Sequence, residues 1–293
     1  MSRVLHEFLV NQRWYAHKGA AITSVIFADY VHITASRGDG AIAFIDAAAA
    51  EVGPERYALP LTIAWESESD DPINRLQPNV LARVRQGPNL GALYDAMASQ
   101  EFPAAIVDAI SKGMTFETAH GRRLICSATD AYNEYRDVDP QNFSRLGVEQ
   151  SNTSLLVDNR MVLKLYRRLQ EGINPEVEIG RFLTDIAKYP NTPGLLGSVE
   201  LLDAASGVTA VAILQEFVRN QGDGWTFTLE HLNRALDDLD LAPPGEDEDL
   251  PVMRDNGYAM MIEVLALRIG ELHRAFTLDV DDDAFTPKAV IEG

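Results

Sequence analysis

One lysine in an otherwise apolar segment constrains the fold of this chain more than any other feature. The segment Met161-Val-Leu-Lys-Leu-Tyr166 has the alternation of a β-strand, which places Val162, Lys164 and Tyr166 on one face. A lysine between two leucines is costly to bury without a partner. Lys164 is therefore either an edge-strand residue that faces solvent or a residue held by a specific partner.

The segments around Lys164 predict a hairpin. Residues 154–157 and 161–166 form two short strands, and Asp158-Asn-Arg160 is a polar stretch suited to a tight turn between them. The preceding segment, Glu149-Gln-Ser-Asn-Thr-Ser154, carries short hydroxyl and amide side chains. Its side chains and backbone N–H groups could hold phosphate oxygens, although an ordinary loop has the same composition.

A helix predicted at 176–187 supplies candidate partners for the lysine. Asn174 is a good N-cap, and Pro175 suits the first helical position. Glu176 and Glu178 follow in the first turn, where the helix dipole by itself also favours acidic residues. A strand lysine that contacts nucleotide phosphates and pairs with a helix glutamate is typical of kinases. We prefer Glu178 as the partner, with Glu176 as the alternative.

Other predicted elements indicate a mixed α and β protein. Residues 22–35, 41–45 and 59–65 favour strands, with Gly38-Asp-Gly40 as a turn between the first two. Residues 89–112 have helical patterning with a break at Pro103, and residues 258–276 form a strong amphipathic helix. Further strands are expected at 122–126, 198–202 and 208–217, and a solvated acidic loop at 237–249.

The charge and cysteine content of the chain exclude some classes of binding partner and site. The net charge of −19 argues against nucleic acid and against an anionic membrane surface. The chain has one cysteine, Cys126, which excludes an internal disulfide framework and a cysteine-rich metal site and fits a reducing compartment. No run of eighteen apolar residues occurs. We expect a cytoplasmic protein.

Several stretches of the sequence together resemble the maltokinases, including those fused behind trehalose synthase. The resemblance runs from near Asn11 to about Phe276, and its motifs follow the family order. The similar stretches are Gln12-Arg-Trp-Tyr-Ala-His-Lys-Gly19, Val148-Glu-Gln-Ser-Asn-Thr-Ser154, Val162-Leu-Lys-Leu-Tyr-Arg-Arg168, Gly172-Ile-Asn-Pro-Glu-Val-Glu178, Gly180-Arg-Phe-Leu183 and Gln215-Glu-Phe-Val-Arg-Asn-Gln-Gly-Asp-Gly-Trp225.

This resemblance implies an α+β fold with a protein-kinase-like, aminoglycoside-phosphotransferase-like N-lobe. An N-terminal cap subdomain would span residues 1–112, the nucleotide-binding N-lobe 113–218, and the start of an incomplete helical C-lobe 219–293. The implied reaction transfers the γ-phosphoryl group of ATP to maltose and gives maltose 1-phosphate for α-glucan synthesis from trehalose. ATP, Mg²⁺, maltose and a fused or associated trehalose synthase are the implied cofactors and partners.

The resemblance also assigns roles to individual residues. Ser151, Thr153 and Ser154 would lie in the phosphate loop, and Lys164 would hold phosphates with Glu178 orienting it. Two further residues, Glu216 and Val218, would supply backbone contacts to adenine.

Two motifs of the family are missing. Its catalytic loop contains His-Gly-Asp and is followed by Asp-Phe-Glu, and neither occurs in this sequence. We therefore assign no catalytic residue and no metal ligand, interpret the sequence as an N-terminal fragment, a split gene product or a truncated paralogue, and expect the chain alone to be inactive. A non-catalytic nucleotide-binding or regulatory module and a related sugar or aminoglycoside kinase remain alternatives. Apolar stripes of unpartnered C-lobe helices would favour self-association.

Overall fold

The computed structural model describes residues 2–50, 52–67, 69–146, 151–204, 207–241 and 256–286. The chain forms two compact units. The first comprises Met1–Ile186 with Pro193–Phe217, and the second comprises Ala187–Thr192 with Val218–Gly293. The predicted cap and nearly all of the predicted N-lobe thus belong to one unit, and the boundary at residue 112 stays a prediction.

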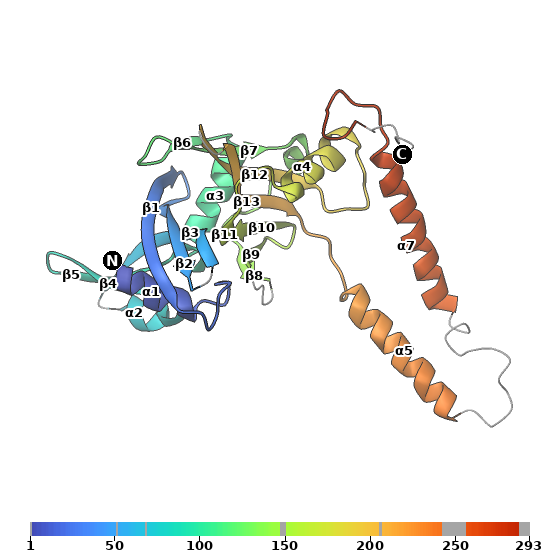
Figure 1. Ribbon diagram of the computed structural model, residues 1–293, viewed down its shortest axis with the longest axis horizontal. Coiled ribbons are helices and arrows are strands. Elements are labelled where there is room, and N and C mark those ends of the chain that lie inside the picture. Colours follow the sequence, from blue (N-terminus) through green and yellow to red (C-terminus); the bar gives the residue numbers. More distant parts are fainter. Residues whose placement is uncertain are drawn as a thin grey trace. The chain divides into compact units, whose positions relative to one another are not determined.

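The first unit contains an antiparallel sheet made from the first hundred residues (Figure 1). Its order is β1-β2-β3-β5-β4, and the short strand β11 (Arg168–Leu169) joins it beside β3. The strands are β1 (Ile22–Ala35), β2 (Gly38–Ala49), β3 (Val52–Trp65), β4 (Val80–Gln86) and β5 (Asn89–Asp95). One core on this sheet includes apolar side chains of helix α1 (Ser2–Asn11) together with Trp14, Tyr15 and Tyr57.

A second antiparallel sheet carries the predicted lysine strand. Its order is β6-β7-β12-β13-β10-β9-β8. The strands are β6 (Thr115–Glu117), β7 (Arg123–Ala128), β8 (Phe143–Arg145), β9 (Asn152–Val157), β10 (Met161–Tyr166), β12 (Leu195–Asp203) and β13 (Gly207–Glu216). The strands expected at 122–126, 154–157, 161–166, 198–202 and 208–217 are confirmed, some with extended ends.

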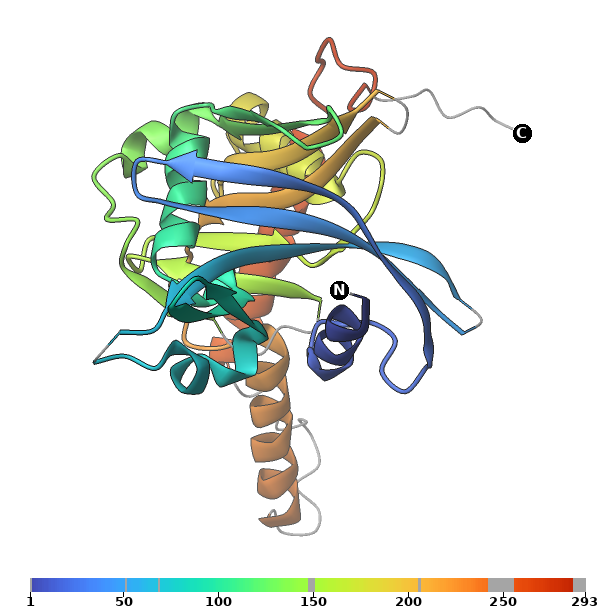
Figure 2. The same ribbon diagram turned by 90° about the vertical axis from the view of Figure 1, so that its left-hand side faces the viewer.

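Helix α3 (Glu101–Ser111) connects the two sheets (Figures 1 and 2). It contacts β1 and β2 of the first sheet and β7 and β12 of the second. Nine of its residues are buried, which explains its almost wholly apolar sequence. The resulting core runs from Phe44 through Phe102 and Ile110 to Leu163.

The helix predicted over 89–112 is wrong in its first half. Residues 89–95 form strand β5, because their alternating side chains pair between β3 and β4. The α-helix begins only at Glu101. Pro103 does not break it, since a proline in the first turn of a helix removes no intrahelical hydrogen bond.

The turn predicted at Gly38-Asp-Gly40 is also wrong. The chain reverses at Ser36 and Arg37, and both glycines lie inside β2, paired with β1. A Cβ on Gly38 would lie 2.6 Å from the carbonyl oxygen of Glu101, and one on Gly40 would lie 2.4 Å from Cδ2 of Phe102. These glycines therefore permit close packing of β2 against α3.

Short helices complete the first unit. Helix α2 (Pro72–Arg75) and the 3₁₀ turns η1 (Gln77–Asn79), η2 (Ala96–Ala98) and η3 (Asp130–Tyr135) join the strands. Helix α4 (Pro175–Arg181) continues as a π-helical stretch, η4 (Phe182–Ile186). The helix predicted at 176–187 is thus confirmed in place, with a wider second half.

The second unit contains helices α5 (Gly224–Leu241) and α7 (Asn256–Ala275). The ring of Tyr258 stacks on His231 at 4.0 Å between centroids, and the Tyr189 hydroxyl donates to the carbonyl of Arg268 at 2.7 Å. The helix predicted at 258–276 is confirmed. The loop predicted at 237–249 is wrong for 237–241, which close α5, and its remaining residues lie outside the described ones.

Many apolar side chains of these two helices are exposed within the described unit. Trp225 of α5 is 73% exposed and Met260 of α7 is 64% exposed. No helix among the described residues is both long and apolar enough to cross a membrane.

Candidate functional site

The hairpin of β9 and β10 positions the candidate residues. Its turn places Asp158 at φ 48° and Asn159 at φ 54°, a left-handed conformation that polar residues of this kind tolerate. Lys164 lies opposite Ser154 on β9 and opposite Ile213 on β13. Directly opposed residues of antiparallel strands share a face, so the ammonium group of Lys164 and the hydroxyl of Ser154 lie on the same side of the sheet.

Lys164 is held by Glu176 at the start of α4. Its Nζ lies 2.8 Å from Oε2 and 3.0 Å from Oε1 of Glu176. The hydroxyl of Tyr166 donates to the same Oε2 at 3.0 Å. Burial raises the pKa of Tyr166, and the charge of Glu176 adds to this effect. The tyrosine therefore remains a neutral donor that fixes the carboxylate.

Local capping orients Glu176. Asn174 caps α4 by accepting the N–H of Glu176 at 2.8 Å, and Pro175 occupies the first helical turn, as predicted. The cap places Glu176 at the end of the helix that meets the lysine strand. An anionic side chain is also favoured there by the helix dipole.

The ion pair differs from the preferred prediction. Lys164 pairs with Glu176, which was the alternative, and not with Glu178. Two residues turn an α-helix by about 200°, so Glu178 starts from nearly the opposite side of α4. The sequence could not decide between them because both lie in the first turn. The assigned role of Glu178 at a nucleotide stays a prediction.

The predicted phosphate segment is described only from Ser151 onward. Residues 149 and 150 of that segment lie outside the described ones. Ser151 is exposed, and the hydroxyl of Thr153 accepts a 2.8 Å hydrogen bond from Nε of Arg167. The Ser154 hydroxyl is buried and has no hydrogen-bond partner among the described residues. Of these residues, Ser154 shares the face of Lys164.

Glu216, at the end of β13, is fixed by its neighbours. Its backbone N–H donates to the carbonyl of Gly194 at 2.9 Å, and its carboxylate accepts the Gly194 N–H at 2.9 Å and the Tyr135 hydroxyl at 2.6 Å. Burial, together with the Glu216 carboxylate, raises the pKa of Tyr135 to about 12. An adenine contact from Glu216 would therefore use its backbone carbonyl. Val218 begins the longer segment of the second unit and is 54% exposed.

Sequence reasoning did not single out Tyr166, Tyr135 or Arg167, although each holds a predicted residue in place. Tyr166 and Arg167 lie within the stretch that carries the resemblance, and the alternation of β10 already put Tyr166 beside Lys164. The ring of Tyr135 comes from η3, which no sequence pattern linked to β13.

Similarity to known proteins concerns the cap and the fold. Residues 8–98 match the family of maltokinase N-terminal cap domains. A solved structure of glucosamine kinase in complex with glucosamine, ADP and inorganic phosphate is similar at TM-score 0.50 and 15% identity, covering 92% of this chain and 51% of that one. A crystal form of glucosamine kinase gives TM-score 0.49 and 14% identity, covering 92% of this chain and 51% of that one.

The chain thus spans about half the length of the solved chains it resembles. At this level of identity the likeness concerns the fold. The chain has an α+β, kinase-like fold with antiparallel sheets, and its residues 8–98 are similar to the maltokinase N-terminal cap domains.

Proposed function

We propose that this chain is the nucleotide-binding part of a sugar kinase of the maltokinase type, which transfers a phosphoryl group from ATP to maltose. The observation that carries the proposal is the maltokinase cap match at residues 8–98 in a chain whose fold resembles a glucosamine kinase. The ion pair of Lys164 with Glu176 supports the nucleotide part.

The proposed chemistry uses Lys164 as a phosphate ligand. Its ammonium group would neutralise phosphate oxygens, while Glu176 and Tyr166 keep the side chain extended along the sheet face. The Ser154 hydroxyl, on the same face, would donate to a phosphate oxygen. The carbonyl of Glu216 and the N–H of Val218 would hold the adenine ring, and Glu178 and Ser151 belong to the same proposal.

Phosphoryl transfer in kinases also uses Mg²⁺. The residues that the structure describes contain no group of three or more His, Cys, Asp or Glu side chains placed to hold a metal ion. We therefore name no Mg²⁺ ligand among the described residues and derive no step through the ion. Because the sequence lacks His-Gly-Asp and Asp-Phe-Glu, we expect the chain alone not to phosphorylate maltose.

Calorimetric titration of the chain with ATP tests the nucleotide site. We expect binding by the unchanged chain and by the control Lys18→Ala, whose exposed side chain lies in the cap. Lys164→Ala should bind at least tenfold more weakly, since a hydrogen bond between charged groups contributes about 1.5–3 kcal/mol. Absence of ATP binding by the unchanged chain, or equal binding by Lys164→Ala, would contradict the proposal.

A phosphorylation assay tests the rest. Maltose or glucosamine turned over above a blank by the chain alone would overturn the expected inactivity and would identify the acceptor. The resemblance to the maltokinases also implies an association with trehalose synthase. Co-elution of the two proteins in size-exclusion chromatography would support this association, and separate elution would contradict it.

A further inference from the structure

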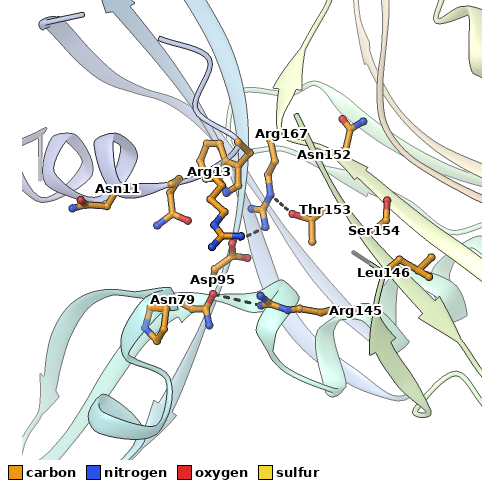
Figure 3. A pocket seen from close by; sticks show the side chains of 13 residues that line it. Asn11, Arg13, Asn79, Asp95, Arg145, Leu146, Asn152, Thr153, Ser154 and Arg167 are labelled. Carbon is orange, nitrogen blue, oxygen red and sulfur yellow. Dashed lines mark hydrogen bonds and ion pairs between the residues drawn. The ribbon is translucent and has the colours of Figure 1, made fainter. Parts of the chain in front are cut away.

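A cavity of about 440 Å³ lies between the cap and the hairpin strand β9. One side comes from residues after α1 and from the end of β5, and the other side comes from β8, β9 and the residue after β10 (Figure 3). Its polar lining includes Arg13, Asn79, Asp95, Arg145, Asn152 and Arg167. A volume of this size fits a small molecule.

Arg167 is the most deeply placed charge in this cavity, with a side chain 2% exposed. Its Nη2 lies 2.6 Å from Oδ2 of Asp95, and its Nε donates to the hydroxyl of Thr153. The guanidinium lies 5.0 Å from the centre of the Trp14 ring. Nη1 is buried and has no hydrogen-bond partner among the described residues. A buried charged donor without an acceptor is unfavourable, so the site is suited to a ligand that supplies one.

Two more arginines give the cavity an excess of positive charge. Arg13 is exposed and makes no hydrogen bond or ion pair within the described part of the chain, and Figure 3 shows its side chain directed toward Asp95 and Arg167. The side chain of Arg145 lies across the cavity and contacts Asn79 at 3.5 Å. Among the described residues of this lining, Asp95 is the single acid. Three guanidinium groups against one carboxylate form an anion site in a chain with a net charge of −19.

The cavity borders the face that carries Lys164, because Asn152 and Ser154, which share that face, are among its lining residues, but its three arginines do not lie on that face. Thr153 and Ser154 are neighbours on β9, so their side chains point to opposite faces of the sheet. Ser154 is opposite Lys164, whereas Thr153 binds Arg167. Arg145 is opposite Leu155, two residues from Thr153, and therefore shares the Thr153 face. Lys164 does not line the cavity.

We propose that this cavity binds the phosphate group of a small molecule, separately from the nucleotide face. Planar guanidinium groups match phosphate oxygens through paired hydrogen bonds, and Nη1 of Arg167 is an available donor. The bound phosphate joins the cap residue Arg13 to Arg145 of the β8 strand. Occupancy therefore stabilises the contact between the cap and the lysine hairpin.

Titration with inorganic phosphate in a phosphate-free chloride buffer of constant ionic strength tests the site. The unchanged chain is expected to bind phosphate, and saturating phosphate is expected to raise its melting temperature. Arg13→Gln and Arg145→Gln each weaken binding at least fivefold, and the double variant abolishes it. Both side chains are exposed, so these variants keep the fold, which circular dichroism checks. Arg123→Gln, an exposed arginine that does not line the cavity, binds as the unchanged chain does.

A second arm uses glucose 1-phosphate in place of free phosphate. Tighter binding of the sugar phosphate assigns the site to sugar phosphates, and equal binding assigns it to the phosphate group alone. No binding of either ligand overturns the proposal, as does equal binding by the double variant. Lys164→Ala must retain phosphate binding; loss there overturns the separation from the nucleotide face. Failure of ATP binding with phosphate binding intact counts against the proposed function only.

Discussion

The hydroxyl of Thr118 donates a 2.6 Å hydrogen bond to Oδ2 of Asp29. This contact joins β1 of the first sheet to the loop between β6 and β7 of the second. Asp29 is fully buried and also accepts the N–H of Tyr30 at 2.8 Å, while His120 Nδ1 lies 3.0 Å from its Oδ1. The carboxylate of Asp29 thus connects the two sheets at this edge through hydrogen bonds.

Replacement of Asp29 should change the acid stability of the fold. Burial alone would raise the pKa of Asp29, but hydrogen bonds from Thr118, Tyr30 and His120 outweigh it and hold the pKa below its usual value. A lowered pKa stabilises the folded state above the unfolded-state pKa of about 4, and this stabilisation disappears as the pH falls through the folded-state pKa. Asp29→Asn should lower the free energy of unfolding at pH 7 by about 1–3 kcal/mol.

Urea unfolding at several pH values between 7 and 3 measures this effect. Stability of Asp29→Asn should fall less steeply below about pH 4 than that of the unchanged chain. The control Asp237→Asn, at an exposed position of α5, should follow the unchanged chain. A variant whose free energy of unfolding has the same pH dependence as that of the unchanged chain would show that Asp29 does not cause the loss of stability in acid.

The effects of replacing Arg167 and Asp95 on the free energy of unfolding should be strongly non-additive. Both side chains are nearly fully buried, and Asp95 also accepts the N–H of Met97 at 3.0 Å. Arg167→Met leaves the Asp95 charge uncompensated and should lower the free energy of unfolding by about 3–5 kcal/mol. The double variant with Asp95→Asn should be less destabilised than the sum of the single variants. Additive losses in denaturant unfolding would contradict a direct ion pair.

Gly40→Ala should be destabilising even though alanine is ordinarily tolerated in a strand. The new methyl group would meet the Phe102 ring, and overpacking of this kind costs about 1–3 kcal/mol. Gly53→Ala is the matched control, since a Cβ at Gly53 of β3 has no atom within 4 Å. Thermal unfolding of the two variants should separate them; equal melting temperatures would mean that α3 shifts freely.

Glu176→Gln and Glu178→Gln distinguish the two candidate partners of Lys164 within the proposed nucleotide site. Glu176→Gln removes the carboxylate that holds the lysine at 2.8 Å and should weaken ATP binding severalfold. Glu178→Gln should weaken binding less, because the ion pair of Lys164 is with Glu176. The opposite result in the same titration would restore Glu178 as the functional partner when nucleotide is bound.

Local chemistry explains what could be predicted from the sequence. The turn at Asp158 and Asn159 and the cap at Asn174 with Pro175 depend on neighbouring residues, and the structure confirms them. Strands β7, β9, β10, β12 and β13 of the second sheet were also predicted, because apolar runs between polar turns indicate buried strands, whereas the short strands β6 and β8 were not. The kinase-like fold was implied by the resemblance to the maltokinases.

The wrong predictions concern residues whose structure depends on contacts between segments that are distant in the sequence. Gly38 and Gly40 have the composition of a turn, but their role depends on α3, about sixty residues later. Helix α5 was missed because its acidic end resembles a solvated loop. The choice between Glu176 and Glu178 depends on how α4 is rotated against β10, and the charges around Arg167 meet only after both sheets form.

The short strand β11 begins four residues after Lys164, at Arg168, and pairs with β3 of the cap sheet. Between them, the carbonyl of Arg167 accepts the N–H of Ala58 at 2.8 Å. The cap is therefore not a module that can be exchanged between relatives at a linker. A chimaera cut at residue 112 would have to supply both a compatible β3 edge and an acid in place of Asp95. We therefore expect the sequences of the cap and of the lysine strand to change together in evolution.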